Sequence, residues 1–176
     1  MTSKHSILIL IICLILAFTG CGHKKEETAS ICPFAEVSWE DTIDDILHAE
    51  GTAYSTYDSV YGGICYTFPK EYEGRNGTIK YMFDGENQLM CVAWAYGCES
   101  EKELLELYES INTSVNDIYG ESSYGANHPG NYGNVWYLES GDIVLTTMIT
   151  SENKALQYAY LHPLVSKEAA LKSPLP

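Results

Sequence analysis

Apolar side chains recur with a period near 3.6 residues in two segments of the chain, which predicts two amphipathic helices. The first segment begins with Ser38 as N-cap and Asp41 three residues later, and it ends at Gly51. The second begins in the same way at Ser100 and ends at Gly120. The apolar stripe of the second helix consists of Leu104, Leu107, Tyr108, Ile111, Val115 and Ile118. Each predicted helix therefore has one face to bury.

After each helix the period of the pattern changes to about two, and Tyr and β-branched residues become frequent, as is typical of strands. The expected strands lie near residues 61–68, 78–83, 88–95, 134–139, 142–150 and 155–161. Pairs of turn-forming residues separate them: Asn76-Gly77, Asp84-Gly85, Ser140-Gly141 and Glu152-Asn153. Each half of the chain is thus predicted to be a helix followed by a three-stranded antiparallel meander.

A helix with one apolar stripe cannot bury itself, and an antiparallel meander has one face to cover, so the helices should pack on the sheet. The predicted fold class is α+β, with tandem αβββ halves at about 36–98 and 99–165 whose two sheets could join into one. By element order, residues 38–161 weakly resemble the tandem helix-plus-sheet fold of the β-lactamase inhibitor protein and of small lipoproteins of outer-membrane barrel assembly. This resemblance implies a protein-binding module and transfers no functional residues.

The N-terminus has the order of a secretory signal, with Lys4 ahead of an unbroken apolar run at residues 7–18. A run of this length is short of the roughly 20 residues that a membrane-spanning helix needs. At its end, Phe18-Thr19-Gly20-Cys21 resembles the bacterial lipobox, with Phe18 where Leu is usual. The resemblance implies that a diacylglyceryl group is attached to Cys21 and that cleavage leaves Cys21 as the first residue. The alternative is an ordinary signal peptide with an unrelated Cys near its cleavage site.

These features predict four segments: a lipoprotein signal peptide at 1–20, the lipidated Cys21 with a polar tether at 21–35, one α+β domain at 36–165, and a flexible tail at 166–176. The expected location is extracytoplasmic, with the lipid in the cell membrane, or in the outer membrane where a cell has two membranes. The chain has room for one domain of ordinary size with a hydrophobic core.

The formal net charge of −14 narrows the choice of partners. An acidic protein is repelled by the phosphates of nucleic acid and by anionic lipid head groups. Nucleic acid is therefore excluded as a partner, and membrane attachment should depend on lipid. The composition also includes 14 Tyr, a residue that packs and forms hydrogen bonds at once.

Four cysteines remain once the leader and Cys21 are set aside: Cys32, Cys65, Cys91 and Cys98. An exported location permits disulfides among them, in three pairings that the sequence does not separate. The other interpretation is that they are buried free thiols. The spacing contains no CxxC pair, so it does not indicate zinc.

The sequence contains no motif typical of an active site. Its histidines are scattered, no nucleophile elbow of the G-x-S-x-G kind occurs, and no pair of carboxylates stands out among the 24 acids. We therefore expect no catalytic residues, no bound metal and no cofactor, and a protein that is not an enzyme.

The segment 119–137 has the composition of a recognition surface, with Tyr and Gly beside Asn and Ser. Its candidate binding residues are Tyr124, Asn127, His128, Asn131 and Tyr132. The alternative is an irregular connection whose tyrosines pack on the sheet. The next two residues should alternate, with one of Trp136 and Tyr137 inward and the other outward.

The predicted function is non-catalytic binding of a protein or another envelope component by a lipid-anchored domain. A small solute-binding lipoprotein is the first alternative, and an envelope enzyme without a recognisable motif is the second. A pocket lined by Tyr would favour a solute, whereas a flat exposed patch of Tyr and Trp would favour a protein.

Overall fold

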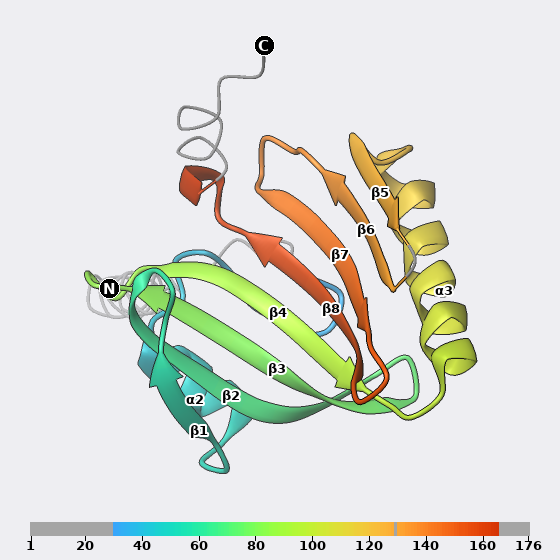
Figure 1. Ribbon diagram of the computed structural model, residues 1–176. Helices are drawn as coiled ribbons and strands as arrows, with labels where there is room; N and C mark the ends of the chain where they lie inside the picture. Colours follow the sequence, from blue (N-terminus) through green and yellow to red (C-terminus); the bar gives the residue numbers. More distant parts are fainter. Residues whose placement is uncertain (1–29, 129, 166–176) are drawn as a thin grey trace, which may run out of the picture.

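A computed structural model describes residues 30–128 and 130–165. These residues form one eight-stranded antiparallel sheet with the strand order β1-β2-β3-β4-β8-β7-β6-β5 (Figure 1). The predicted signal peptide, the lipidation site Cys21, most of the predicted tether and the predicted tail at 166–176 lie outside the described residues.

Along the chain, each of two helices is followed by a run of four strands. The helices are α2 (Ile43–Glu50) and α3 (Glu101–Tyr119). The strands are β1 (Ser55–Asp58), β2 (Gly62–Tyr72), β3 (Arg75–Asp84), β4 (Leu89–Gly97), β5 (Tyr124–His128), β6 (Asn131–Trp136), β7 (Asp142–Ile149) and β8 (Lys154–Leu161). The last strand pairs with β4, and this pairing makes the two runs one sheet.

The expected fold class, a tandem of helix and three-stranded meander, is wrong. The chain is mostly β and forms a single sheet to which β1 and β5 add an edge strand at either end. Neither edge strand has an alternating pattern that a sequence could reveal. All four residues of β1 are exposed, and β5 reads Tyr-Gly-Ala-Asn-His with little apolar character. Short polar strands are common at sheet edges, where they discourage pairing with other chains.

The start of the first helix also differs from the prediction. Ser38 and Asp41 form a closed turn, in which the Ser38 backbone N–H donates to the Asp41 carboxylate at 2.9 Å. The same sequence pattern recurs four residues later, where Thr42 is the N-cap of α2 and forms a full capping box with Asp45. The predicted cap at Ser100 and end at Gly120 of the second helix are confirmed.

The expected turn at Asn76-Gly77 is wrong, because both residues lie within β3. The chain reverses at Glu73 and Gly74, whose φ angles of 49° and 67° are both positive. Gly77 is explained by packing, since a Cβ atom there would lie 2.6 Å from the Trp94 indole and from a backbone carbonyl of β4. The expected turn at Asp84-Gly85 is confirmed between β3 and β4.

The main core lies between the helices and one face of the sheet. Strand side chains such as Ile79, Trp94 and Leu145 are fully buried there against Ile46 of α2 and Ile111 of α3. The N-terminal segment completes this layer with the buried side chains of Cys32, Phe34 and Val37. The packed part of the chain therefore begins within the segment 21–35 that was predicted to be the tether.

Polar contacts fix α3 and α2 on the sheet. The Trp136 indole N–H donates to the Asn116 side chain and to a backbone carbonyl at the end of α3, both at 3.1 Å. Trp136 is buried and Tyr137 is exposed, which confirms the predicted alternation. At the other helix, the Glu50 carboxylate accepts from the Lys70 ammonium at 2.8 Å and from the Tyr81 hydroxyl at 2.6 Å.

Candidate binding surface

The second face of the sheet carries no helix in the described part of the chain. Figure 1 is viewed from this side, with α2 behind β1 and β2 and with α3 beside β5 at the right. Since strand side chains alternate between faces, the pairing register identifies the residues that point this way. They include two neighbouring rows across the sheet: Tyr57, Cys65, Met82, Cys91, Leu161 and the buried Asp142, then Thr67, Lys80, Ala93, Ala159 and Val144. We call this surface the open face.

Small side chains form the centre of the open face. Ala93 and Ala159 pair directly across β4 and β8, and Cys91 lies in the next row. These three residues form a second apolar cluster, separate from the main core. The partly buried side chains packed around them are Tyr61, Met82, Val144 and Leu161. The centre is therefore low and apolar, and larger side chains stand around it.

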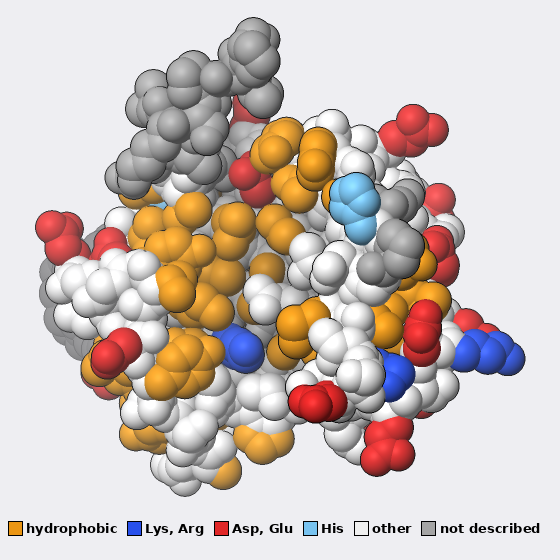
Figure 2. Space-filling view, viewed as in Figure 1, with side chains coloured by type: hydrophobic (Ala, Val, Ile, Leu, Met, Phe, Trp, Pro, Cys, Tyr) orange, Lys and Arg blue, Asp and Glu red, His pale blue; other side chains and the backbone are white. Residues whose placement is uncertain are grey.

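Large exposed apolar side chains surround this centre. Tyr57 on β1 is 48% exposed, Tyr124 on β5 is 60% exposed and Met148 on β7 is 50% exposed. Figure 2 shows hydrophobic side chains gathered over this face, with a basic side chain among them. Exposed aromatic and Met side chains that group on one surface are typical of protein contact sites.

The one basic residue in these two rows is Lys80. It pairs with Thr67 on one side and with Ala93 on the other, so its immediate neighbours across the strands are uncharged. No carboxylate of the described residues lies within ion-pair distance of its ammonium, whereas Lys70, Arg75 and Lys102 each pair with a Glu.

Two buried thiols of the open face, Cys65 and Cys91, lie beside the exposed Tyr57 and the partly buried Tyr61. Burial raises the pKa of Cys91 to about 12 and also raises the pKa of Cys65, although Lys80 acts in the opposite direction on both. Burial likewise raises the pKa of Tyr57 and of Tyr61 to about 12. All four groups are therefore uncharged at neutral pH, and the two thiols are poor nucleophiles.

The four cysteines in the described residues are free. Cys65 and Cys91 both pair with Met82, from opposite sides, which puts them two strands apart at roughly 9–10 Å. That separation is beyond the reach of a disulfide. Cys32 lies in the main core on the other side of the sheet, so it is not placed to bridge to either of them.

The Tyr-rich segment is an edge hairpin of β5 and β6, with Asn127 paired with Tyr132 and His128 paired with Asn131. The register puts Tyr124, His128 and Asn131 on the open-face side. Tyr132 lies on the helix side, where it is partly buried against Tyr108 with ring centroids 6.2 Å apart. The five predicted binding residues therefore do not form one surface.

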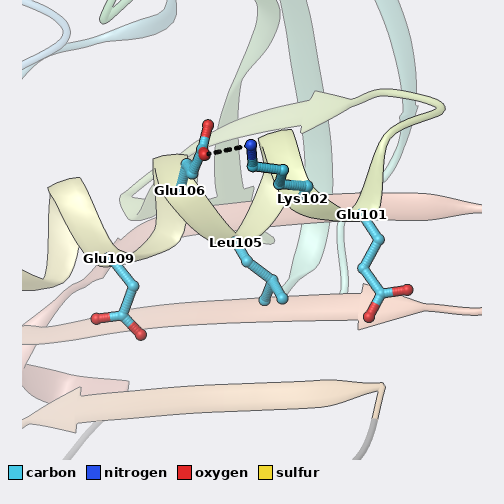
Figure 3. Close-up of a pocket in the computed structure, with 5 residues that line it drawn as sticks. All are labelled: Glu101, Lys102, Leu105, Glu106 and Glu109. Atoms are coloured by element: carbon cyan, nitrogen blue, oxygen red, sulfur yellow. Dashed lines mark ion pairs between the residues drawn. The ribbon is translucent and has the colours of Figure 1, made fainter.

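Three hollows at the surface of the described residues are small or have one wall only. Figure 3 shows one along α3, where Glu101, Leu105 and Glu109 point to one side while Lys102 and Glu106 form an exposed ion pair at 3.6 Å. All of its lining residues belong to this one helix. Such a hollow offers no enclosed space for a ligand.

A second hollow of about 240 Å³ lies between the N-terminal segment and the end of α3, and its lining includes Tyr72, Tyr119, Tyr158 and Tyr160. Its volume is below the roughly 300–1,000 Å³ usual for ligand pockets. A third, of about 320 Å³, lies beside Trp39 and at the low end of that range.

Within residues 30–128 and 130–165, no three His, Cys, Asp or Glu side chains are grouped closely enough to hold a metal ion. The helices of the same residues include none with the length and apolar character to cross a membrane.

Comparison with known proteins gave no match: no family model, no curated protein and no solved structure is similar to this chain. The resemblances to the lipobox and to the β-lactamase inhibitor fold therefore stay predictions from the sequence.

Proposed function

We propose that this protein is an extracytoplasmic lipoprotein, anchored through lipid on Cys21, that binds another protein through the open face and catalyses no reaction. The observation that carries the proposal is the open face itself. Within residues 30–128 and 130–165, no helix covers this sheet surface, which has small buried side chains at its centre and exposed Tyr57, Tyr124 and Met148 around them. Leaving this much apolar surface exposed is unfavourable in water, and a protein partner would remove it from water.

The shape of the molecule favours a protein partner over a small solute. The open face is broad and formed by strands from both ends of the chain. Aromatic side chains contribute much of the binding energy at protein interfaces when they surround or fill a closely packed centre. The exposed tyrosines of the open face provide such groups, and the small central residues leave room for side chains of a partner.

A small-solute role is the second candidate, and the hollow that includes Tyr72, Tyr119, Tyr158 and Tyr160 favours it. Tyrosine rings bind cations through their faces, and the protein is strongly acidic. Equilibrium dialysis with tetramethylammonium as the probe tests this role. Binding that Tyr160→Phe leaves intact and Tyr72→Ala removes would favour the hollow as its site.

The anchor is tested by comparing the intact mass and the membrane fraction of the wild type with those of Cys21→Ala in a bacterial host. We expect a diacylglyceryl-sized mass on a new N-terminus at Cys21 in the wild type and none in the variant. If both proteins are soluble and cleaved elsewhere, the lipid anchor is wrong.

The binding surface is tested by photocrosslinking in cells that make the protein. A benzophenone amino acid is placed at Tyr57 or Thr146 on the open face, and at Ser110 on the outer side of α3 as a control. We expect one discrete crosslinked protein from the two open-face positions and none from the control. Crosslinks of equal yield from both sides would refute the assignment of this face.

A further inference from the structure

The charge distribution of the open face identifies the chemistry of its partner. The chain carries 24 Asp and Glu against 10 Lys and Arg, so a basic residue has many acids available for pairing. Lys70, Arg75 and Lys102 each use one. Lys80, on a central strand of the sheet, and Lys154, at the start of β8, lie within 4 Å of none in the described residues, and of these two only Lys80 is on the open face.

The surroundings of Lys80 make an unpaired ammonium unfavourable. The side chain is half-buried, and its neighbours across the strands are a Thr and an Ala. The row beside it holds Cys65, Met82 and Cys91, which are uncharged at neutral pH, and the acid of that row, Asp142, lies at its far end on β7, three strands from Lys80. A partner that covers this apolar surface removes water from the ammonium, which is costly unless the partner supplies a negative charge.

A second copy of the same chain does not fit this requirement. Two chains with a formal charge of −14 each repel one another before they meet. A partner with one acid inside an otherwise apolar contact fits better, because only the contact itself has to be complementary to the open face.

We infer that the partner of the open face is a protein that inserts an Asp or Glu side chain, flanked by apolar side chains, against the Lys80 ammonium. This inference rests on the proposed function, because it assumes that the open face is the binding surface. The flanking apolar side chains lie over Ala93 and Ala159 and meet the ring of Tyr57.

The test uses a displayed library of random peptides, selected on the lipid-anchored protein in detergent micelles. Peptides with an Asp or Glu between apolar residues should be enriched. Binding of the selected peptides should weaken about 30-fold or more in Lys80→Glu, since the change places two like charges together, and less in Lys80→Gln. It should also weaken as salt is added.

The control for net charge is Lys154→Glu, which makes the same change on the helix side of β8. It should leave peptide binding unchanged. Circular dichroism of each variant shows whether it is folded, and Lys80→Gln provides the comparison if Lys80→Glu does not fold.

Three outcomes separate this inference from the proposed function. Acidic peptides that Lys80→Glu weakens and Lys154→Glu does not weaken support both. Peptides without acids that depend on Tyr57 and bind Lys80→Glu normally overturn the acidic partner and leave the open face as the binding surface. Peptides that depend on neither Tyr57 nor Lys80 overturn both.

Discussion

The contact between α2 and the sheet should depend strongly on one carboxylate. Glu50 accepts hydrogen bonds from the Lys70 ammonium at 2.8 Å and from the Tyr81 hydroxyl at 2.6 Å. The Glu50 side chain is 9% exposed, and that of Lys70 is 27% exposed. Glu50→Ala removes the acceptor and leaves both donors without it in a nearly buried position.

The structure sets the size of the expected effect. Removing one partner from a buried ion pair costs about 3–5 kcal/mol. Because Lys70 is partly exposed, water can solvate its ammonium in the variant, and we expect the low end, about 3 kcal/mol. Glu50→Gln keeps an oxygen that can accept both bonds and loses only the charge, so we expect about 1–2 kcal/mol.

Urea unfolding followed by fluorescence of the buried Trp94 and Trp136 measures these differences. The matched control is Glu106→Ala, which removes the acid of an exposed pair with a 3.6 Å separation. Because exposed pairs on helices contribute roughly 0.3–0.5 kcal/mol, Glu106→Ala should lower the free energy of unfolding by no more than that.

A double-mutant cycle with Lys70→Ala separates the ion pair from the bond to the tyrosine. Lys70→Ala in the Glu50→Ala background should have little further effect. If Glu50→Ala and Glu106→Ala reduce the free energy of unfolding equally, the buried contact does not fix α2 as described.

Three other predictions concern pH, thiol chemistry and packing. Burial lowers the pKa of His162 from 6.5, so the unfolded chain binds protons more readily, and this residue should reduce stability as the pH falls below about 6.5. Melting curves at pH 7.5 and 5.5 should therefore differ more in the wild type than in His162→Gln, and equal differences would contradict this. Ellman's reagent at pH 8 should react faster with Cys98 than with the fully buried Cys91, so Cys98→Ser should remove the fast phase of the reaction. A fast phase that persists in Cys98→Ser would contradict this prediction. Gly77→Ala should lower the free energy of unfolding in urea, because its Cβ would overlap the Trp94 indole. Gly97→Ala should be tolerated, since its Cβ would have no contact closer than 3.6 Å. Equal effects of the two changes would show that packing does not explain Gly77.

Elements with local signals were predictable from the sequence. The helix from Glu101 to Tyr119 has its cap, its apolar stripe and its terminal glycine within one continuous segment, and the cap and the glycine appear as expected. The predicted stripe is buried except for Ile118 in the last turn, which is 72% exposed. The first helix begins four residues later than predicted, because Ser38 and Thr42 each begin the same sequence pattern. The sequence does not say which of the two forms the turn and which forms the cap.

The edge strands and the open face could not be predicted in this way. Strands β1 and β5 have no apolar alternation and become strands by pairing with neighbours. Ala93 and Ala159 are 66 residues apart and meet only because β4 pairs with β8 in one register. A single chain sequence shows that each lies in an apolar strand, but it does not show that they form one surface with Lys80.

The pairing of β4 with β8 also determines when the fold can be completed. All residues from Leu89 to Trp94 of β4 are buried, and the partner along one side of this strand is the last strand of the sheet. Until residues 154–161 have emerged, that side of β4 exposes unpaired backbone groups along an apolar segment, which is a template for aggregation. A chain that stops before residue 154 therefore retains the first four strands and lacks the strand that protects them. Proteases and chaperones that act on newly made chains would encounter β4 as an open edge from the time it is synthesised until β8 has been synthesised.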